Sequence, residues 1–408
     1  MKTFISENND SAEVILLIEP PQGGHGAFRR KAILISHMIE NSIPFILLST
    51  PSKNISPLNK ILPSSIKNSQ IFKNILSVNS VVEHLFALLC TGKSKINSIR
   101  FVSFSEYETI YFFLLKVFSM FRKNLFYRHI SSIHKLRFRV LTFSRGDIVS
   151  IYRVNNPNAN GYLNFSYCAY IAHYMILQYL GLLLSDKYAV QMPFLRHILI
   201  HRFKYLFRPI HVICNNLPNE PHTQSIEDAS KSVPKAQNFS NQITVALVAP
   251  LYKYCKGLDI FIDCCRLLEM SYKVNVFVAG SGPDELFIKE KLKYLSGSSV
   301  HFGWLSDLSE LFDNTDVIII PSRYDSCPNL LLEAMTRNSP RIMASNIKSH
   351  SELLCEDKLL FDLSLSDFLS KFKSLLLLSD VQYSSLLDHR RRELTFDWPS
   401  KVIEWVNS

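Results

Sequence analysis

The sequence predicts an α/β protein built from two doubly wound domains, and three observations lead to this prediction. The chain has 408 residues, which is more than one hydrophobic core normally serves. Short apolar runs alternate with amphipathic helical segments in both halves, the pattern of βαβ units. A stretch rich in Pro, Ser, Asn and Gln separates the halves as a linker would. We therefore expect a first domain at 1–218, a linker at 219–242, a second domain at 243–390 and a terminal helix within 391–408 that crosses back to the first domain.

The first half opens with a strand at 14–18, a glycine-rich loop, a helix at 27–41 and a strand at 43–48. Three of the 12 glycines lie within four positions of that loop, so the backbone is expected to turn tightly or to approach a ligand there. Further on we expect helices separated by short strands, including strands at 99–104 and 148–152. A strand beginning at His211 closes the domain.

In the second half, strands and helices alternate more regularly, as a doubly wound parallel sheet requires. The expected strands are 243–248, 274–279, 300–302, 316–320, 341–344 and 359–361. The expected helices are 259–270, 283–295, 308–313, one from Pro328, one from Asp367 and a terminal helix at 398–406.

Charge is unevenly divided between the halves. Residues 1–225 carry 25 Lys and Arg against 11 Asp and Glu, and the remainder carries 20 against 24. Residues 116–153 contain nine basic residues and a single acid, Asp147, and the basic residues are interleaved with apolar side chains. Such a patch attracts nucleic acid or anionic lipid, and without a zinc-finger spacing or an RNA-recognition signature we expect a membrane surface and no nucleic acid. A solvated helix face is the structural alternative.

Two segments bear on location. The N-terminal apolar run is five residues long and ends at Glu19, too short for a secretory signal, and the eight cysteines form no CxxC pair. We expect a cytoplasmic protein with reduced, mostly buried thiols. The uncharged stretch 166–185 is long enough to span a membrane, but His173 and Gln178 favour a buried or interface-lying helix, with insertion as the alternative.

The segment PSRYDSCPNLLLEAM, residues 321–335, carries the clearest chemical signal. It follows an apolar run typical of a buried parallel strand, and Pro328 suits the first position of a helix. Asp325 is then expected in the loop at the carboxyl end of the strand, and Glu333 about one and a half turns into the helix. The free N–H groups of the first helical turn lie between the two acids and favour an anion such as phosphate. A surface loop with a solvated Glu is the alternative.

Five ordered blocks in the second half resemble the retaining nucleotide-sugar glycosyltransferases of family 4. The blocks are KGLD at 256–259, VFVAGSGPDE at 276–285, VHFGWLSDLSELF at 300–312, DVIIIPSRYDSCPNLLLEAM at 316–335 and PRIMASNIKSHSELL at 340–354. Looser similarity lies at 20–40, 185–194 and 210–219. The resemblance implies the GT-B fold, two Rossmann-like domains that face a central cleft.

The resemblance also implies roles for particular residues. Asp325 and Glu333 occupy the family's paired acids, the first beside the reacting sugar and the second at the ribose of the nucleotide. Lys256 matches the lysine that binds phosphate, although a solvated lysine is the simpler structural interpretation. The expected donor contacts are Gly24, Gly280, Ser281, Gly282, Trp304, Ser322, Arg323, Ser326, Cys327, Asn329 and Leu330.

Three departures from the family pattern stand out. Asp325 replaces a Glu and is shorter by one methylene. Pro250 stands where relatives commonly have a second phosphate-binding Arg, so a cation is missing unless Lys253 or Arg323 substitutes. The histidine that relatives often carry at the end of a strand in the first domain has no clear counterpart.

The best match for that histidine position is 152–155, so Arg153 or Asn155 is expected to face the reaction centre. His25, in the glycine-rich loop, is the histidine expected on the acceptor side, with an ordinary turn residue as the simpler interpretation.

The resemblance implies a hexosyl- or related glycosyltransferase that moves a sugar from a nucleotide diphosphate donor to an acceptor hydroxyl with retention, without metal or other cofactor. We expect a lipid-linked saccharide acceptor in bacterial surface polysaccharide or lipopolysaccharide synthesis. The basic first domain would place the enzyme at the inner face of the cytoplasmic membrane. The alternatives are a degenerate protein acting as a membrane-associated partner and, in another enzyme class, a nucleotide-sugar epimerase.

Overall fold

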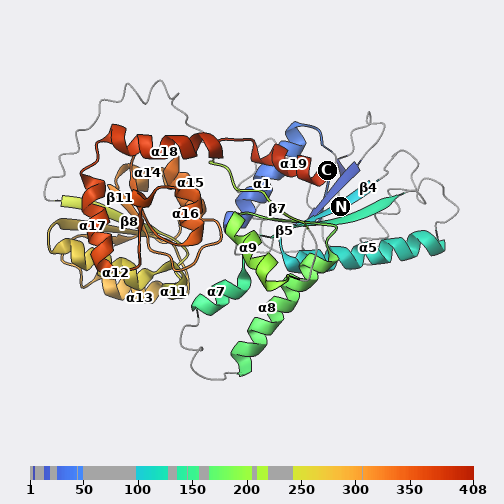
Figure 1. The fold of residues 1–408 in the computed structure, drawn as a ribbon, viewed down its shortest axis with the longest axis horizontal. Coiled ribbons are helices and arrows are strands. Elements are labelled where there is room, and N and C mark those ends of the chain that lie inside the picture. The colour runs from blue at the N-terminus through green and yellow to red at the C-terminus, as the bar shows by residue number, and fades with distance from the viewer. Residues whose placement is uncertain are drawn as a thin grey trace.

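A computed structural model shows two α/β domains, each built on its own sheet (Figure 1). The structure describes residues 3–4, 13–18, 25–43, 45–48, 98–126, 136–144, 146–155, 165–204, 209–218, 242–305 and 307–408. Almost all of the expected linker lies outside these ranges.

The first domain has a seven-stranded sheet in which every described strand pair except one is parallel. Its order is β1 (Thr3–Phe4), β3 (Phe45–Leu48), β2 (Glu13–Ile18), β4 (Ser98–Ser103), β5 (Arg137–Ser144), β6 (Lys187–Val190) and β7 (Ile210–Val212). The exception is β1, which runs antiparallel to β3 at the edge. All six residues of β4 are buried, as expected for a central parallel strand covered on both faces.

Helices cover both faces of this sheet. They are α1 (His25–Glu40), α5 (Glu106–Phe126), α7 (Ile148–Asn155), α8 (Phe165–Leu184) and α9 (Pro193–Arg202). In Figure 1, α1 lies above the sheet, whereas α5 and α8 lie below it.

The second domain has a fully parallel six-stranded sheet. Its order is β10 (Ser299–His301), β9 (Lys273–Ala279), β8 (Gln242–Val248), β11 (Val317–Ile320), β12 (Arg341–Ser345) and β13 (Leu360–Phe361). Counted along the chain this is the order 3-2-1-4-5-6 of a doubly wound sheet, and each expected strand is confirmed to within one residue at either end. The order reverses between β8 and β11, where such sheets bind ligands at the carboxyl ends of the strands.

The helices of the second domain are α11 (Lys253–Lys256), α12 (Leu258–Glu269), α13 (Glu285–Leu292), α14 (Ser309–Asp313), α15 (Asn329–Met335), α16 (Lys348–Leu354) and α17 (Leu365–Leu376), with a short 3-10 helix at Asp357–Leu359. The residue pattern of α12 illustrates why these segments form helices. Its buried residues include Leu258, Phe261, Cys265 and Leu268, spaced three or four apart so that one face packs on the sheet.

The last two helices join the domains. α18 (Asp380–Leu394) begins at a capping box formed by Ser379 and Gln382, and α19 (Trp398–Asn407) then packs beside α1 of the first domain (Figure 1). The fully buried Trp398 ring lies 6.0 Å from the ring of Phe143 on β5. The C-terminal helix is therefore part of the first domain's core.

Three local expectations were wrong. Residues 148–152 form the start of α7, and the strand in this region is β5 at Arg137–Ser144. The apolar run at 148–152 is too short for its periodicity to separate strand from helix. His25 is the first residue of α1 and not part of a turn, and Pro328 is the N-cap of α15, one position before the helix.

Candidate functional site

Lys256 and Asp325 meet at the point where the strand order of the second sheet reverses. Lys256 follows β8 and ends α11, and Asp325 lies in the loop between β11 and α15. The Lys256 ammonium nitrogen is 2.5 Å from Oδ2 of Asp325. Two residues that are 69 positions apart are thus brought together because β8 and β11 are parallel neighbours.

Gly257 makes this approach possible. Its backbone is left-handed, with φ of 65°, and a Cβ there would lie 2.0 Å from the carbonyl oxygen of Pro321. A side chain would force the loop after β8 away from the loop after β11. The glycine next to Lys256 therefore has a direct structural role in closing the pair.

The ion pair is partly covered, with side-chain exposures of 17% for Lys256 and 15% for Asp325. Burial alone would lower the pKa of Lys256, but the Asp325 carboxylate outweighs it and the pKa is raised. The ammonium is held in its charged form. An incoming phosphate would compete with Asp325 for it.

The two cations considered as replacements for the missing Arg are otherwise engaged. Both terminal nitrogens of Arg323 donate to the Asp259 carboxylate, at 2.8 and 2.7 Å. Burial raises the pKa of Asp259, but the bonds from Arg323 outweigh it and the pKa is lowered. The Lys253 ammonium lies 4.4 Å from the centre of the Phe287 ring. Arg323 is thus paired with Asp259 in this arrangement, and the donor contacts expected of Arg323 and Lys253 stay predictions.

The glycines of the 280–282 loop serve the packing of one loop on another. A Cβ on Gly280 would lie 1.8 Å from the oxygen of Ala249, and one on Gly282 would lie 2.6 Å from the oxygen of Leu251. Ser281 is exposed, and its carbonyl accepts the Leu251 N–H at 3.0 Å. The glycine loop thereby braces the segment that leads into Lys256.

Trp304 follows β10 and is 44% exposed, so it is not a core residue. Gly303 before it has φ of 69°, and a Cβ at this position would have no atom within 4 Å. Trp304 lies at the same carboxyl edge of the sheet as Lys256, because β10, β9 and β8 are parallel.

The remaining residues of the motif divide between the interior and the domain interface. Ser322 is buried, and its carbonyl oxygen accepts a hydrogen bond from the Ser345 hydroxyl at 2.6 Å. This bond fixes the start of the loop after β11 to the end of β12. Burial raises the pKa of the half-buried Cys327 thiol to about 12. Asn329 accepts a hydrogen bond from Asn215 of the first domain at 3.2 Å. Leu330 packs against the core.

Glu333 lies in the second turn of α15 and is half-buried. It is on the same helix as Asn329, whose side chain contacts the first domain. The acid is therefore placed eight positions after Asp325 on a rigid element, as expected from the sequence.

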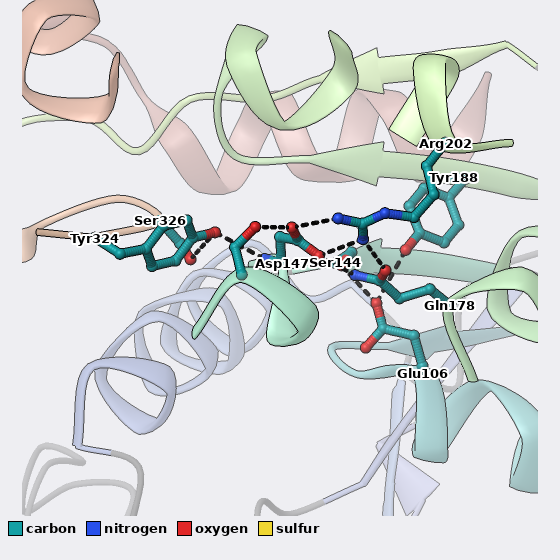
Figure 2. Close-up of polar contacts among 9 residues, drawn as sticks. Glu106, Ser144, Asp147, Gln178, Tyr188, Arg202, Tyr324 and Ser326 are labelled. Carbon is teal, nitrogen blue, oxygen red and sulfur yellow. Dashed lines mark hydrogen bonds and ion pairs between the residues drawn. The ribbon is translucent and has the colours of Figure 1, made fainter. Parts of the chain in front are cut away.

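The first domain contributes a buried carboxylate that sequence reasoning missed (Figure 2). Asp147 follows β5 and is 1% exposed. Arg202 of α9 donates to both of its oxygens at 2.6 and 2.8 Å, and Gln178 of α8 donates at 3.0 Å. Burial raises the pKa of Asp147, but these hydrogen bonds and one from Ser150 outweigh it and the pKa is lowered.

This carboxylate holds a turn that touches the donor-side loop of the second domain. The Asp147 N–H donates to the Tyr324 hydroxyl at 3.2 Å, and a Cβ on Gly146 would lie 2.3 Å from the Ser326 hydroxyl. Tyr324 and Ser326 flank Asp325. The turn after β5 is therefore the part of the first domain that approaches the Lys256–Asp325 pair.

The expected acceptor-side residues do not lie in that turn. Because 148–155 is a helix, Arg153 is exposed in the last turn of α7 and Asn155 is its final residue. The mid-domain strand β5 ends at Ser144, and Gly146 and Asp147 lie between it and α7. Gly24 and the His25 side chain lie outside what the structure describes. One sequence signal could have found Asp147, since it is the single acid among nine basic residues.

A second buried cluster lies behind the turn (Figure 2). Glu106 accepts the Ser144 hydroxyl at 2.6 Å and the Tyr188 hydroxyl at 3.0 Å. Burial and Glu106 raise the pKa of Tyr188 well above its usual range. Across the part of the chain that the structure describes, no group of three or more His, Cys, Asp or Glu is arranged to hold a metal ion.

Comparison with known proteins agrees with this arrangement. Residues 229–380 match the family model described as glycosyl transferases group 1. This match covers most of the second domain. No curated protein matches the chain in sequence.

Solved structures extend the likeness to the whole chain. A glycosyltransferase from Rickettsia africae ESF-5 is 15% identical with a TM-score of 0.61, over 97% of this chain and 98% of that one. The lipopolysaccharide outer core galactosyltransferase WaaB is 13% identical with a TM-score of 0.59, over 97% and 98%. HepE from Anabaena, in complex with UDP and glucose, is 12% identical with a TM-score of 0.57, over 97% and 99%. These likenesses show the GT-B fold of two Rossmann-like domains.

In this group 1 glycosyltransferase domain, the geometry offers one held cation, one carboxylate and a helix start at a single edge of the sheet. Lys256 can stabilise negative charge that develops on a departing phosphate. Asp325 can hydrogen-bond sugar hydroxyls or stabilise positive charge at the reacting carbon. Gly146 and Asp147 bring the first domain to the same place.

Proposed function

We propose that this protein transfers one sugar from a nucleotide diphosphate donor to an acceptor hydroxyl, with retention of the anomeric configuration. The observation that carries the proposal is the Lys256–Asp325 pair at the β8–β11 switch point of a group 1 glycosyltransferase domain.

In this reaction the bond between the anomeric carbon and the diphosphate oxygen breaks, and its electron pair leaves with the nucleoside diphosphate. The sugar passes through an oxocarbenium-like state, and the acceptor oxygen bonds to the same face of the carbon. The acceptor proton goes to the departing phosphate. Lys256 stabilises the negative charge on the leaving group, Asp325 lies on the sugar side, and Glu333 binds the ribose. The proposal assigns no step to a metal or other cofactor.

The relatives suggest where to look for substrates. HepE is seen with UDP, with UDP and glucose, and with UDP-glucose, which supports a UDP-sugar as the first donor to test. WaaB is named a lipopolysaccharide outer core galactosyltransferase, which supports a lipid-linked saccharide acceptor in surface polysaccharide synthesis. The basic first domain supports a peripheral location at the inner face of the cytoplasmic membrane.

One observation favours a second candidate, a degenerate glycosyltransferase that acts as a membrane-associated partner. Asp325 neutralises Lys256, and the cations that could replace the missing Arg are tied to Asp259 and Phe287. A diphosphate would have to displace Asp325 from the ammonium to bind.

Donor binding separates the two candidates. We would measure the thermal shift of the protein with UDP-, GDP- and dTDP-sugars, using Lys256→Ala as the test and Lys293→Ala, an exposed lysine of the same domain, as the control. A ligand at a hundredfold excess over its dissociation constant stabilises the folded state by about 2.7 kcal/mol. The proposal expects one donor to shift the wild type and Lys293→Ala but not Lys256→Ala. If no donor shifts the wild type, the degenerate partner is the better description.

A further inference from the structure

Helix α8 is apolar along its length, yet half of it is not buried by the protein. It carries no Asp, Glu, Lys or Arg over its 20 residues. Its window Tyr167–Leu184 has a mean hydropathy of 1.3, and 22% of these residues are buried. The buried ones are Leu177, Gln178, Gly181 and Leu182, whereas no residue from 167 to 176 is buried. In Figure 1 the N-terminal half of α8 extends away from the body of the first domain.

Helix α5 packs against α8 and adds a second unburied apolar row. The two helices contact each other through the Tyr107 hydroxyl and His173 Nε2, 3.0 Å apart, and Lys116 of α5 pairs at 2.7 Å with Asp186, two residues after α8. On α5 the large exposed apolar residues recur at helical spacing. Together with α8 they form what we term the α5–α8 apolar face, Leu114, Val117, Phe118, Phe121, Tyr170 and Ile176, each between 43 and 60% exposed. Six large apolar side chains left exposed on two packed helices point to an interaction site.

We propose that the α5–α8 apolar face docks the protein on an anionic lipid surface, with the N-terminal half of α8 lying in the membrane interface. The inference deepens the proposed function and rests on it for the lipid-linked acceptor.

Helix length decides between lying in the interface and crossing the bilayer. The unburied part, residues 167–176, is about 15 Å long at 1.5 Å per residue, half of a hydrocarbon core of about 30 Å. The other half of α8 is anchored in the protein, since Gln178 bonds both Asp147 and Arg202. Spanning would require these buried bonds to break. The buried residues of α8 therefore all lie in its second half, and residues 167–176 lie on the surface.

The charge of this region favours docking on an anionic lipid surface over pairing with a second copy of the chain. Residues 98–204 contain 14 Lys and Arg against 4 Asp and Glu. Of those acids, Glu106 and Asp147 are buried, and Asp186 is paired with Lys116. Of the bases, Arg100 is buried and Arg202 pairs with Asp147, whereas Arg137, Arg153 and Arg196 are exposed. Anionic headgroups complement exposed bases of this kind. A second copy of the chain pairing through the same face would instead oppose positive charge with positive charge.

The composition of α8 agrees with the headgroup region. Its four tyrosines, Tyr167, Tyr170, Tyr174 and Tyr179, combine an apolar ring with a polar tip, which suits the boundary between acyl chains and water. Helix α9 lies beside it, with the Phe203 ring at its C-cap 5.9 Å from that of Tyr179, and presents exposed Arg196 to solvent.

Vesicle flotation of the full chain tests the proposal. We would compare vesicles of phosphatidylcholine with vesicles that also contain phosphatidylglycerol, for the wild type, Ile176→Glu, Phe121→Glu and the control Leu377→Glu. Leu377 is 85% exposed on the second domain, so its variant adds the same charge away from the face. We expect the wild type and the control to float with the anionic vesicles, and each face variant to lose at least about tenfold in partitioning.

Two results would overturn the docking proposal. One is a wild type that floats with neither vesicle, or face variants with unchanged melting temperature that float like the wild type. The other is a dimer in light scattering that Ile176→Glu dissociates, which would make the face a contact between copies. The donor thermal shift is measured on the same variants. Flotation without a donor shift would count against the proposed function alone, and a donor shift without flotation would count against the docking face alone.

Discussion

At the residue scale, the chemistry of the site depends on how Lys256 divides its charge between Asp325 and a ligand. The shorter Asp side chain still reaches the ammonium, at 2.5 Å, so the substitution of Asp for Glu leaves a direct ion pair in this structure. The same carboxylate that would act on the sugar therefore also masks the cation that would receive the phosphate. Binding and turnover should respond to Asp325 in opposite directions.

We predict that Asp325→Ala lowers sugar transfer at least about a hundredfold while UDP binding becomes about fivefold tighter. Transfer falls because the sugar-side carboxylate is lost. Binding tightens because a partly exposed ion pair contributes roughly 1 kcal/mol, which the diphosphate no longer has to displace. Calorimetric titration with UDP and a transfer assay would measure the two effects. Asp313→Ala, which removes an exposed acid of the same domain, is the control, and weaker UDP binding in Asp325→Ala would contradict the prediction.

At the element scale, the site exists because short loops leave neighbouring parallel strands at one edge of the sheet. The loop after β8 carries Lys256 and the loop after β11 carries Asp325, and Gly257 lets their backbones touch. The glycines at 280 and 282 do the same for the loop after β9. Because these glycines have no side chain, the loops can pack directly on one another. This packing fixes the positions of Lys256 and Asp325.

We predict that Gly257→Ala destabilises the protein by more than Gly303→Ala. Both positions have positive φ, 65° and 69°, so both variants incur about 1–2 kcal/mol of backbone strain. Only at Gly257 would the new Cβ also collide with a backbone atom, 2.0 Å away at Pro321, whereas nothing lies within 4 Å at Gly303. Denaturant unfolding would measure both free energies. Equal losses would mean that the approach of the two loops does not contribute.

At the scale of the whole molecule, the chain returns to its first domain at its C-terminus. Trp398 and Trp405 of α19 lie in the core beside Phe143, whose ring is 6.0 and 6.4 Å from theirs. Phe143 precedes Ser144, so α19 supports the strand that leads to Gly146 and Asp147. The C-terminal helix thereby stabilises the part of the first domain that approaches the Lys256–Asp325 pair.

We predict that Trp398→Ala lowers the free energy of unfolding by about 3–5 kcal/mol, as expected for removing a large buried ring. Val381→Ala on α18, where the side chain is 81% exposed, should change it by less than about 0.5 kcal/mol. Denaturant unfolding gives both values. Hydrogen exchange should show the loss of protection in β5 and α1 of the Trp398→Ala variant, and protection lost only in the second domain would contradict this role for α19.

Much of the second domain could be predicted because its signals are local. Apolar runs of four to seven residues specify strands buried on both faces, and the spacing within 258–268 specifies a helix with one buried face. The first domain was less predictable. The apolar run at 148–152 fits both the helix and the strand pattern. The strand Arg137–Ser144 contains Arg137 and Arg139 near its start, so its sequence does not stand out as a buried apolar run.

Local sequence was enough to specify the fold class, the strand–loop–helix motif around Asp325 and the position of Lys256 after the first strand of the second sheet, because these depend on residues close together in the chain. The partners that these groups meet depend on the folded arrangement. Arg323 is tied to Asp259 across 64 positions, and Asp147 is bound by Arg202 across 55. Likewise, the buried residues of α8 all lie in its second half, although the whole helix is apolar. Such contacts depend on which strands become neighbours and which helix faces the sheet covers, and no local pattern encodes that choice.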